Sequence, residues 1–256
     1  TTPAEPVLVA PRLLIAAGSE SQVFVVESHA GLTDAASLVA AVTHVDVAAS
    51  GRVEHVKLQR EPAAAFHLSS TFVRLDRAAV FTSQAITLGG RIARNDISAE
   101  LAGEGAECTL DGVYIADGDT LVDTHTTIDH AKPHCPSHEV YKGILAGRAR
   151  AVFNGKIIVR EDAQKTDAQV YNKNLLLSED ARVNTNPEFK ILADENRGNV
   201  EVLYEVALLS MQIEDWPIAE TQLNQLLTMP FRDRELLQLH LGQIAEEQKR
   251  YDEALT

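Results

Sequence analysis

The sequence predicts a mainly β protein: a β-solenoid over residues 1–195, followed by a small all-α tail of helical repeats over residues 196–256. The apolar runs before residue 196 are short, rich in β-branched side chains and separated by Gly, Asp, Asn or Ser, which is typical of strands. Of the 14 glycines, 13 precede Asn199. Residues 1–198 carry 26 acidic and 19 basic side chains and residues 199–256 carry 11 and 4, so each part has a net charge of −7. The two parts therefore differ in architecture.

Short apolar segments in the first part predict strands of three to six residues. They lie at residues 23–26, 53–58, 72–75, 86–88, 97–101, 113–115, 151–153, 156–159, 175–177 and 189–192. Amphipathic segments of helical length are absent between most of them, which excludes a repeated βαβ layout. A sandwich, a barrel or a β-solenoid remains.

The spacing of turn residues favours the solenoid. Glycine-containing turns are expected at residues 89–90, 103–105, 111–112 and 117–118, close enough together to form the corners of successive coils. Five asparagines either stack as amide ladders at the corners or simply mark turns. They are Asn154, Asn172, Asn174, Asn184 and Asn186. Sandwich strands would instead be expected to pair through two-residue hairpins.

Residues 122–192 resemble the core of the SufB/SufD family of iron–sulfur cluster assembly proteins, with SufD the nearer match. The resemblance rests on the segments FNGKIIV at 153–159, DAQKTDA at 162–168 and NKNLLLS at 172–178, and it extends over about residues 7–195. It implies a right-handed parallel β-helix that acts as a non-catalytic scaffold. In this family the β-helix pairs with a SufB-like partner, the ATPase SufC binds a helical region that follows it, and the assembled complex holds the iron–sulfur cluster.

The sequence departs from this family after residue 194. Relatives of SufD continue into a Cys-x-His stretch and then into the helices that dock SufC, whereas here no Cys or His occurs between Asp194 and His240. The family's N-terminal helical region is missing as well. We therefore expect a scaffold that is impaired in cluster formation and does not bind SufC.

The tail has helical periodicity and resembles a tetratricopeptide repeat over about residues 199–256. Similar residues recur at an offset of 35, as in the pairs Val206 and Leu241, Ala207 and Gly242, Trp216 and Tyr251, and Ala219 and Ala254, and Pro230 lies near the position of the repeat's terminal proline. Such repeats need several copies to bury their faces, so the tail is expected either to dock on the β-helix or to belong to a fragment. A peptide-binding adaptor and a non-functional fusion of two coding segments are the alternative functions.

Metal ligands crowd together only between residues 125 and 138. His125 begins this stretch, and the candidate metal ligands in it are His130, His134, Cys135 and His138. Imidazole and thiolate ligands suit iron, zinc or copper. Neighbouring residues of a strand point in opposite directions, so at most part of this set can converge. No catalytic residue and no cofactor-binding motif is predicted.

Composition narrows the partners and the compartment. A net charge of −14 repels nucleic acid and anionic membranes. Two cysteines are far fewer than a disulfide-stapled domain contains, which indicates a reducing, cytoplasmic compartment. Cys108 is expected in the core, and Asp162, Lys165 and Asp167 at a solvated corner. The missing initiator Met indicates a processed protein or a fragment.

Overall fold

The computed structural model describes residues 6–31, 34–192, 200–213, 215–229, 231 and 233–248. It divides the chain into two compact units, Thr1–Lys190 and Ile191–Thr256. The predicted boundary near residue 196 lies outside the described residues. None of the described helices is long and apolar enough to cross a membrane.

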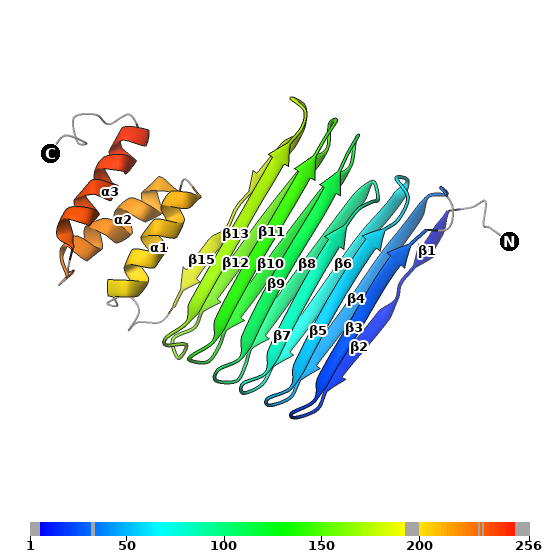
Figure 1. Ribbon diagram of the computed structural model, residues 1–256, viewed down its shortest axis with the longest axis horizontal. Coiled ribbons are helices and arrows are strands. Elements are labelled where there is room, and N and C mark those ends of the chain that lie inside the picture. Colours follow the sequence, from blue (N-terminus) through cyan, green and yellow to red (C-terminus); the bar gives the residue numbers. More distant parts are fainter. Residues whose placement is uncertain are drawn as a thin grey trace. The chain divides into compact units, whose positions relative to one another are not determined.

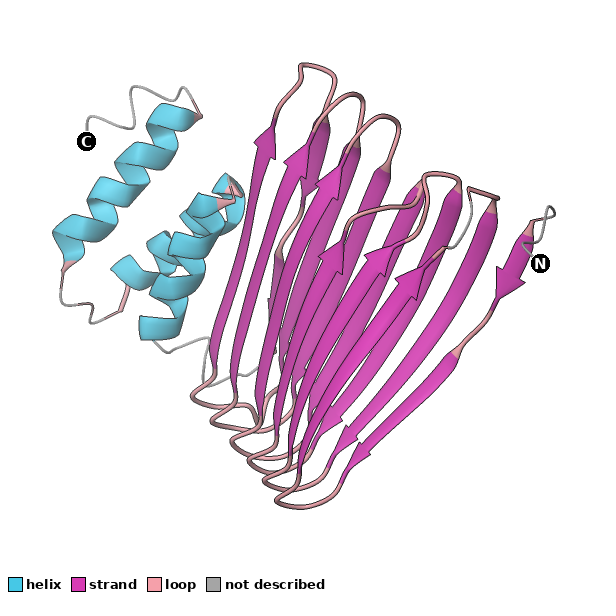
Figure 2. Cartoon of the chain, turned by 45° about the vertical axis from the view of Figure 1, so that its right-hand side comes forward, coloured by secondary structure: helices cyan, strands magenta, loops and turns pink. Residues whose placement is uncertain are grey.

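The first unit is a parallel β-solenoid of about 6 turns, as predicted (Figures 1 and 2). Its strands are β1 (Val7–Val9), β2 (Arg12–Ala17), β3 (Gln22–Ala30), β4 (Ser37–Val47), β5 (Arg52–Arg60), β6 (Ala65–Leu75), β7 (Val80–Thr87), β8 (Ile92–Leu101), β9 (Glu107–Ala116), β10 (Leu121–His130), β11 (Pro136–Leu145), β12 (Arg150–Val159), β13 (Asp167–Leu176), β14 (Arg182–Thr185) and β15 (Glu188–Ile191). Sheet A has the order β1-β4-β6-β8-β10-β12-β14, with β2 beside β4 and β15 beside β12. Sheet B has the order β13-β11-β9-β7-β5-β3. From β2 to β14, successive strands of the chain thus alternate between the sheets.

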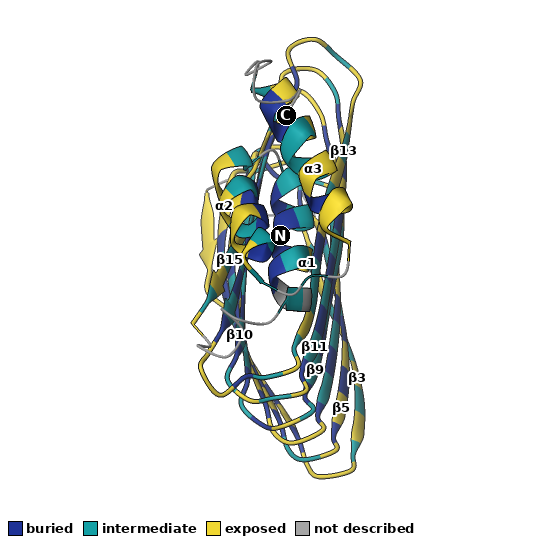
Figure 3. Ribbon diagram, turned by 90° about the vertical axis from the view of Figure 1, so that its left-hand side faces the viewer, coloured by how far each residue is buried: buried dark blue, intermediate teal, exposed yellow. Residues whose placement is uncertain are grey.

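Each coil stacks on the previous one with its strands in parallel register. Partner residues in neighbouring coils are 26 to 32 positions apart. Side chains alternate along most strands between a buried inner position and an outer one, as Figure 3 shows by its alternating colours. The inner positions of both sheets form the core between them, where Phe81, Leu110 and Phe153 are fully buried.

The strands are longer than the sequence indicated. From β3 to β13 they run for 8 to 11 residues instead of three to six. The apolar runs mark only part of each strand, because the inner positions of several strands carry polar side chains that interrupt the hydrophobic pattern. On β6, for example, His67, Ser69 and Thr71 hold the inner positions before the predicted run at residues 72–75.

The predicted turn at residues 111–112 is wrong, since both residues lie inside β9. A Cβ atom on Gly112 would overlap the ring of Tyr141, and one on Gly143 would overlap the ring of Tyr114. Each glycine therefore makes room for an aromatic ring on the neighbouring coil. The other predicted turns, at residues 89–90, 103–105 and 117–118, do lie between strands.

Along one line of corners, backbone amides are paired by hydrogen bonds to backbone carbonyls and not by asparagine ladders. Residues with positive φ recur at corresponding positions of successive coils, and they are Glu20, Ser50, Ala78, Gly105, His134 and Lys165. The amide of each of the first five donates to a carbonyl of the next coil, for instance Ser50 N to Arg77 O at 2.9 Å. Four of the five predicted ladder asparagines lie within β12, β13 and β14, and Asn186 directly follows β14. The strand register pairs join no two of these asparagines, and the turn interpretation holds for Asn186 alone, which lies between β14 and β15.

The second unit contains three described helices, α1 (Val200–Gln212), α2 (Trp216–Leu227) and α3 (Arg234–Glu247). Asp215 caps α2, accepting a hydrogen bond from the amide of Ile218 at 3.4 Å. Residues that the helical periodicity predicted as apolar contacts form the core, and they include Leu203, Ala207, Ala219, Leu223 and Leu226. Three helices do not establish a tetratricopeptide repeat. Tyr251, Ala254 and Pro230 of the predicted repeat lie outside the described residues.

Candidate functional site

The structure separates the predicted metal ligands between residues 125 and 138. His130 is buried at the end of β10, where its Nε2 contacts Ser137 Oγ at 3.0 Å, and burial lowers its pKa to about 4. His134 occupies a corner with φ of 59°. Cys135 is buried, with its Sγ 3.4 Å from the carbonyl of Gly103. His138 lies on β11 between two buried residues, so it points to the outer face. Among the described residues, these four form no group of three convergent ligands.

His125 and the three corner residues have other partners. His125 lies on β10, where its Nε2 is 2.9 Å from the Asp123 carboxylate. Asp162 and Lys165 are exposed at a corner, as expected, whereas Asp167 is exposed but is the first residue of β13. Cys108 is fully buried in the core, which confirms the prediction.

A different set of polar side chains gathers inside the first coils of the solenoid. We call it the polar cluster, and it consists of Glu27, His29, His55, Lys57, Gln59, Glu61 and His67. β3 supplies the first two members, β5 the next three, and β6 supplies His67, while Glu61 directly follows β5. Register places Glu27 beside Lys57 and His29 beside Gln59. Strand alternation thus turns all of these side chains toward the space between the sheets.

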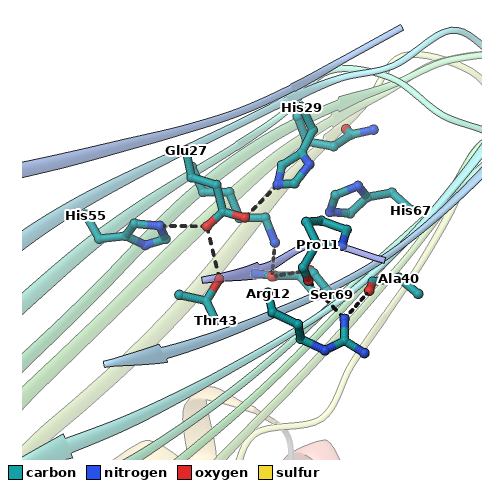
Figure 4. A network of polar contacts seen from close by, with 12 residues as sticks. Pro11, Arg12, Glu27, His29, Ala40, Thr43, His55, His67 and Ser69 are labelled. Atoms are coloured by element: carbon teal, nitrogen blue, oxygen red, sulfur yellow. Dashed lines mark hydrogen bonds and ion pairs between the residues drawn. The ribbon is translucent and has the colours of Figure 1, made fainter. Parts of the chain in front are cut away.

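Glu27 is the centre of one half of the cluster (Figure 4). Its Oε1 lies 2.6 Å from His29 Nε2, and its Oε2 lies 3.1 Å from His55 Nε2. Thr43 Oγ1 donates to Oε2 at 3.2 Å. Burial alone would raise the pKa of Glu27, but the two histidine hydrogen bonds and the charge of Lys57 hold it well below its ordinary value. Glu27 is therefore an ionised carboxylate inside the protein.

Glu61 organises the other half. Gln59 Nε2 donates to Glu61 Oε2 at 2.6 Å, and His67 Nδ1 lies 3.1 Å from Oε1. Burial raises the pKa of Glu61, yet these hydrogen bonds outweigh it and the pKa is lowered. The pKa of His67 is lowered as well, chiefly by burial. At neutral pH a neutral imidazole consequently faces an ionised carboxylate.

His29 joins the two halves. Its ring packs edge-on against the ring of His67 with 4.6 Å between centroids. One potential ligand atom from each of His29, Glu61 and His67 lies within 4.8 Å of the other two, the sole such group of three among the described residues. Imidazole nitrogens and a carboxylate oxygen are ligands for zinc and other first-row divalent metals.

Lys57 places a basic group beside this site. Its Nζ donates to Asn95 Oδ1 at 3.1 Å, and Ser69 Oγ donates to the same oxygen at 2.9 Å. Burial lowers the pKa of Lys57 to about 8, although the charges of Glu27 and Glu61 oppose that shift. A cavity of about 10 Å³ lies against Lys57, Gln59 and His67. The interior can therefore change its charge near neutral pH.

A second buried acid lies further along the solenoid. Glu139 on β11 is fully buried, Thr126 Oγ1 donates to its Oε2 at 2.6 Å, and its Oε1 has no hydrogen-bond partner. Burial raises its pKa to about 7. The neighbouring Tyr141 hydroxyl is also buried and without a partner.

The outer face of sheet B carries an apolar row. Ile115 on β9, Ile144 on β11 and Leu175 on β13 are partners in register. They are 50%, 37% and 56% exposed. Lys142 and Lys173 are also register partners. They lie on the same face, two residues before Ile144 and Leu175. An aligned apolar row beside basic side chains is typical of a protein-binding surface.

The sequence analysis missed the polar cluster, although it contained a signal for it. On β3 and β5 polar and charged residues recur at every second position, as in Glu27-x-His29 and His55-x-Lys57-x-Gln59. Read as strands, these segments predict polar side chains on one face. Which face is buried could not be decided, because both faces of these strands carry apolar and polar residues.

Comparison with known proteins matches the solenoid to one family. The model of the SUF system FeS cluster assembly SufBD core domain matches residues 1–201. The iron–sulfur cluster assembly protein SufD of Escherichia coli is 34% identical over 181 residues, which are 71% of this chain and 42% of that protein. A SufBD family protein of Synechocystis is 30% identical over 197 residues, 74% of this chain and 44% of the relative. The chloroplastic protein ABCI7 of Arabidopsis thaliana is 29% identical over 155 residues, 60% of this chain and 33% of the relative. The chain thus spans less than half the length of each of these relatives.

Proposed function

Because this chain belongs to the SufB/SufD family of iron–sulfur cluster assembly proteins, we propose that it is a non-catalytic scaffold subunit of the Suf system. The family match covers the whole solenoid and carries the proposal. The solenoid is expected to pair with a SufB-like partner, as the family resemblance implies.

The apolar row on sheet B is our candidate for the surface that binds this partner. Ile144 lies at the centre of the row, flanked in register by Ile115 and Leu175. Removing such side chains from water contributes about 25 cal/mol for each Å² of apolar surface buried. An acidic residue at the centre of the row would instead be buried without a charge partner.

Co-purification tests this proposal. The chain is co-expressed with a tagged SufB-like protein from the same source, and retention of the untagged chain is measured. We expect the unchanged chain to be retained and Ile144→Asp to weaken retention by at least about 30-fold, the effect of losing one interface hot spot. Leu68→Asp, an equally exposed position on the outer face of β6, is the matched control. Failure to retain the unchanged chain would refute the pairing, and equal loss for both variants would refute the assignment of the surface.

We further propose that the cluster is held by the assembled complex and not by this chain alone. Both cysteines, Cys108 and Cys135, are buried, and burial raises the pKa of each thiol, so neither is a ready thiolate ligand. No Cys or His lies between Leu192 and His240 in the sequence. Anaerobic reconstitution with iron and sulfide should therefore give visible cluster absorption only when the partner is present. A stable cluster on the isolated chain would contradict this proposal.

A further inference from the structure

We propose that His29, Glu61 and His67 form a binding site for one first-row divalent transition-metal ion inside the first coils of the solenoid. This proposal does not depend on the scaffold role, because the three ligands belong to one chain and no partner is needed to complete the site.

The three side chains already lie at nearly the separation that a metal requires. In a tetrahedral site with bonds of about 2.0–2.1 Å, ligand atoms stand about 3.4 Å apart. The potential ligand atoms of His29, Glu61 and His67 all lie within 4.8 Å of one another. Figure 4 shows the rings of His29 and His67 side by side, and their centroids are 4.6 Å apart.

His67 presents a buried nitrogen without a partner. The residue is 2% exposed, and its Nε2 has no hydrogen-bond partner within the part of the chain that the structure describes. Because the Glu61 carboxylate can only accept a hydrogen bond, the proton of the neutral imidazole lies on Nδ1, which leaves the lone pair on Nε2. An unpaired buried acceptor is unfavourable, because it has given up its hydrogen bond to water without replacement. A metal ion bound to Nε2 would give this lone pair a partner.

Outer hydrogen bonds orient the other two ligands. Glu27 accepts from His29 Nε2 at 2.6 Å, which leaves the lone pair on the Nδ1 of that ring. Such a carboxylate–histidine pair is the usual support of a metal-binding imidazole. Gln59 holds Glu61 in place, donating from its Nε2 at 2.6 Å, and Gln59 Oε1 accepts from the amide of Gly89 at 3.3 Å. The orientation of each ligand is thus fixed before a metal arrives.

Charge and access also suit a cation. The cluster contains two carboxylates, Glu27 and Glu61, and one ammonium group, Lys57, so acidic side chains outnumber the fixed basic one. The side chains of Glu27 and His29 are 12% exposed, which opens the site toward solvent. Two imidazoles with one carboxylate select zinc, iron, cobalt or nickel over magnesium and calcium, which prefer oxygen ligands.

The test uses the full chain, with any affinity tag removed and all metal stripped. Cobalt(II) is titrated against visible absorption, and zinc(II) is measured by competition. We expect one equivalent of cobalt to bind, magnesium to leave the spectrum unchanged, and His67→Gln and Glu61→Gln to weaken binding at least about 100-fold, since loss of even an outer-sphere partner costs about 10- to 100-fold. His138→Gln, which alters an outer-facing histidine, should bind like the unchanged chain.

Two outcomes would overturn the proposal. One is unchanged cobalt affinity in both His67→Gln and Glu61→Gln. The other is loss of binding in His138→Gln or Cys135→Ser, which would place the metal near residues 130–138. If either cluster variant fails to fold, NMR of the histidine side chains in the unchanged chain replaces it. Zinc should then shift the ring nitrogens of His29 and His67, and shifts confined to other histidines would refute the site.

Discussion

Replacing Glu139 by glutamine should stabilise the solenoid at alkaline pH. The Glu139 side chain is fully buried on β11, and its sole recorded hydrogen bond comes from Thr126 Oγ1 at 2.6 Å. The other carboxyl oxygen has no hydrogen-bond partner. Ionisation therefore places a charge in the core with one neutral donor to stabilise it. Glutamine has nearly the same shape as the protonated acid and cannot ionise.

The size of the effect follows from the pKa of Glu139. Burial raises this pKa from 4.5 to about 7. Between these values the folded state retains a proton that the unfolded state has released, so the free energy of unfolding falls as the pH rises. The contribution is fully present below pH 4.5 and is lost as the pH passes about 7. At 1.36 kcal/mol for each pH unit, the loss is about 3 kcal/mol.

Urea denaturation at about pH 5 and about pH 8 measures this contribution. Relative to the unchanged chain, Glu139→Gln should gain about 2.5 kcal/mol of unfolding free energy between the lower and the higher pH, because at about pH 5 the unfolded state has already begun to lose the proton. Glu54→Gln, on the outer face of β5, controls for the loss of one carboxyl from the chain. An equal free-energy difference between Glu139→Gln and the unchanged chain at both pH values would show that Glu139 does not retain its proton in the fold, and it would refute the argument.

Three further predictions follow from other contacts. Gly112→Ala should destabilise the solenoid by about 1–3 kcal/mol in urea denaturation, because its Cβ would overlap the Tyr141 ring, whereas Gly18→Ala, with open space around it, should not. Cobalt affinity should rise as the pH increases through about 8, where Lys57 loses the charge that repels the metal from Glu27 and Glu61, and Lys57→Met should remove this dependence. A stable complex of the chain with SufC in gel filtration would contradict our expectation that SufC is not bound.

The fold could be predicted because its signals are local. β-branched runs and glycine turns indicated a solenoid, and apolar periodicity indicated the helices. The length of the strands could not be predicted, because polar inner residues such as His67, Ser69 and Thr71 of β6 break the apolar runs. The turn assigned to residues 111–112 failed for a related reason. Gly112 leaves space for the ring of Tyr141, which lies 29 residues later in the chain. The residues around Gly112 in the sequence do not reveal that contact.

The corners show the same limit. A line of amide ladders was one expectation, but residues as different as Ser50, Ala78 and His134 adopt positive φ at equivalent corners. Hydrogen bonds between coils hold them there. The stacking of whole coils determines this conformation, so residue type does not reveal it. His134 was a candidate ligand because other histidines and Cys135 lie near it in the sequence. In the solenoid it is a corner residue.

The candidate metal site could not be found by searching for ligands that are close in sequence. His29, Glu61 and His67 span 39 positions and meet because the coil repeats every 26 to 32 residues. By contrast, His134 and Cys135 are adjacent in sequence but belong to no group of three convergent ligands among the described residues. In a solenoid, ligands converge when their separation in the sequence is close to the number of residues in one coil. That number must therefore be known before a sequence spacing can predict a site.

The rest of the solenoid indicates that the polar cluster is not required by the fold. Every coil satisfies its backbone through the same parallel ladders, whatever its inner side chains are. Later coils fill inner positions with groups such as Leu110, Tyr141 and Phe153. Burying the charges of Lys57 and Glu61 costs desolvation energy that apolar residues of similar volume would avoid. The first coils retain these charges at this cost, beside a histidine nitrogen that has no partner among the described residues. Binding of a cation explains this arrangement more simply than a contribution to the stability of the fold.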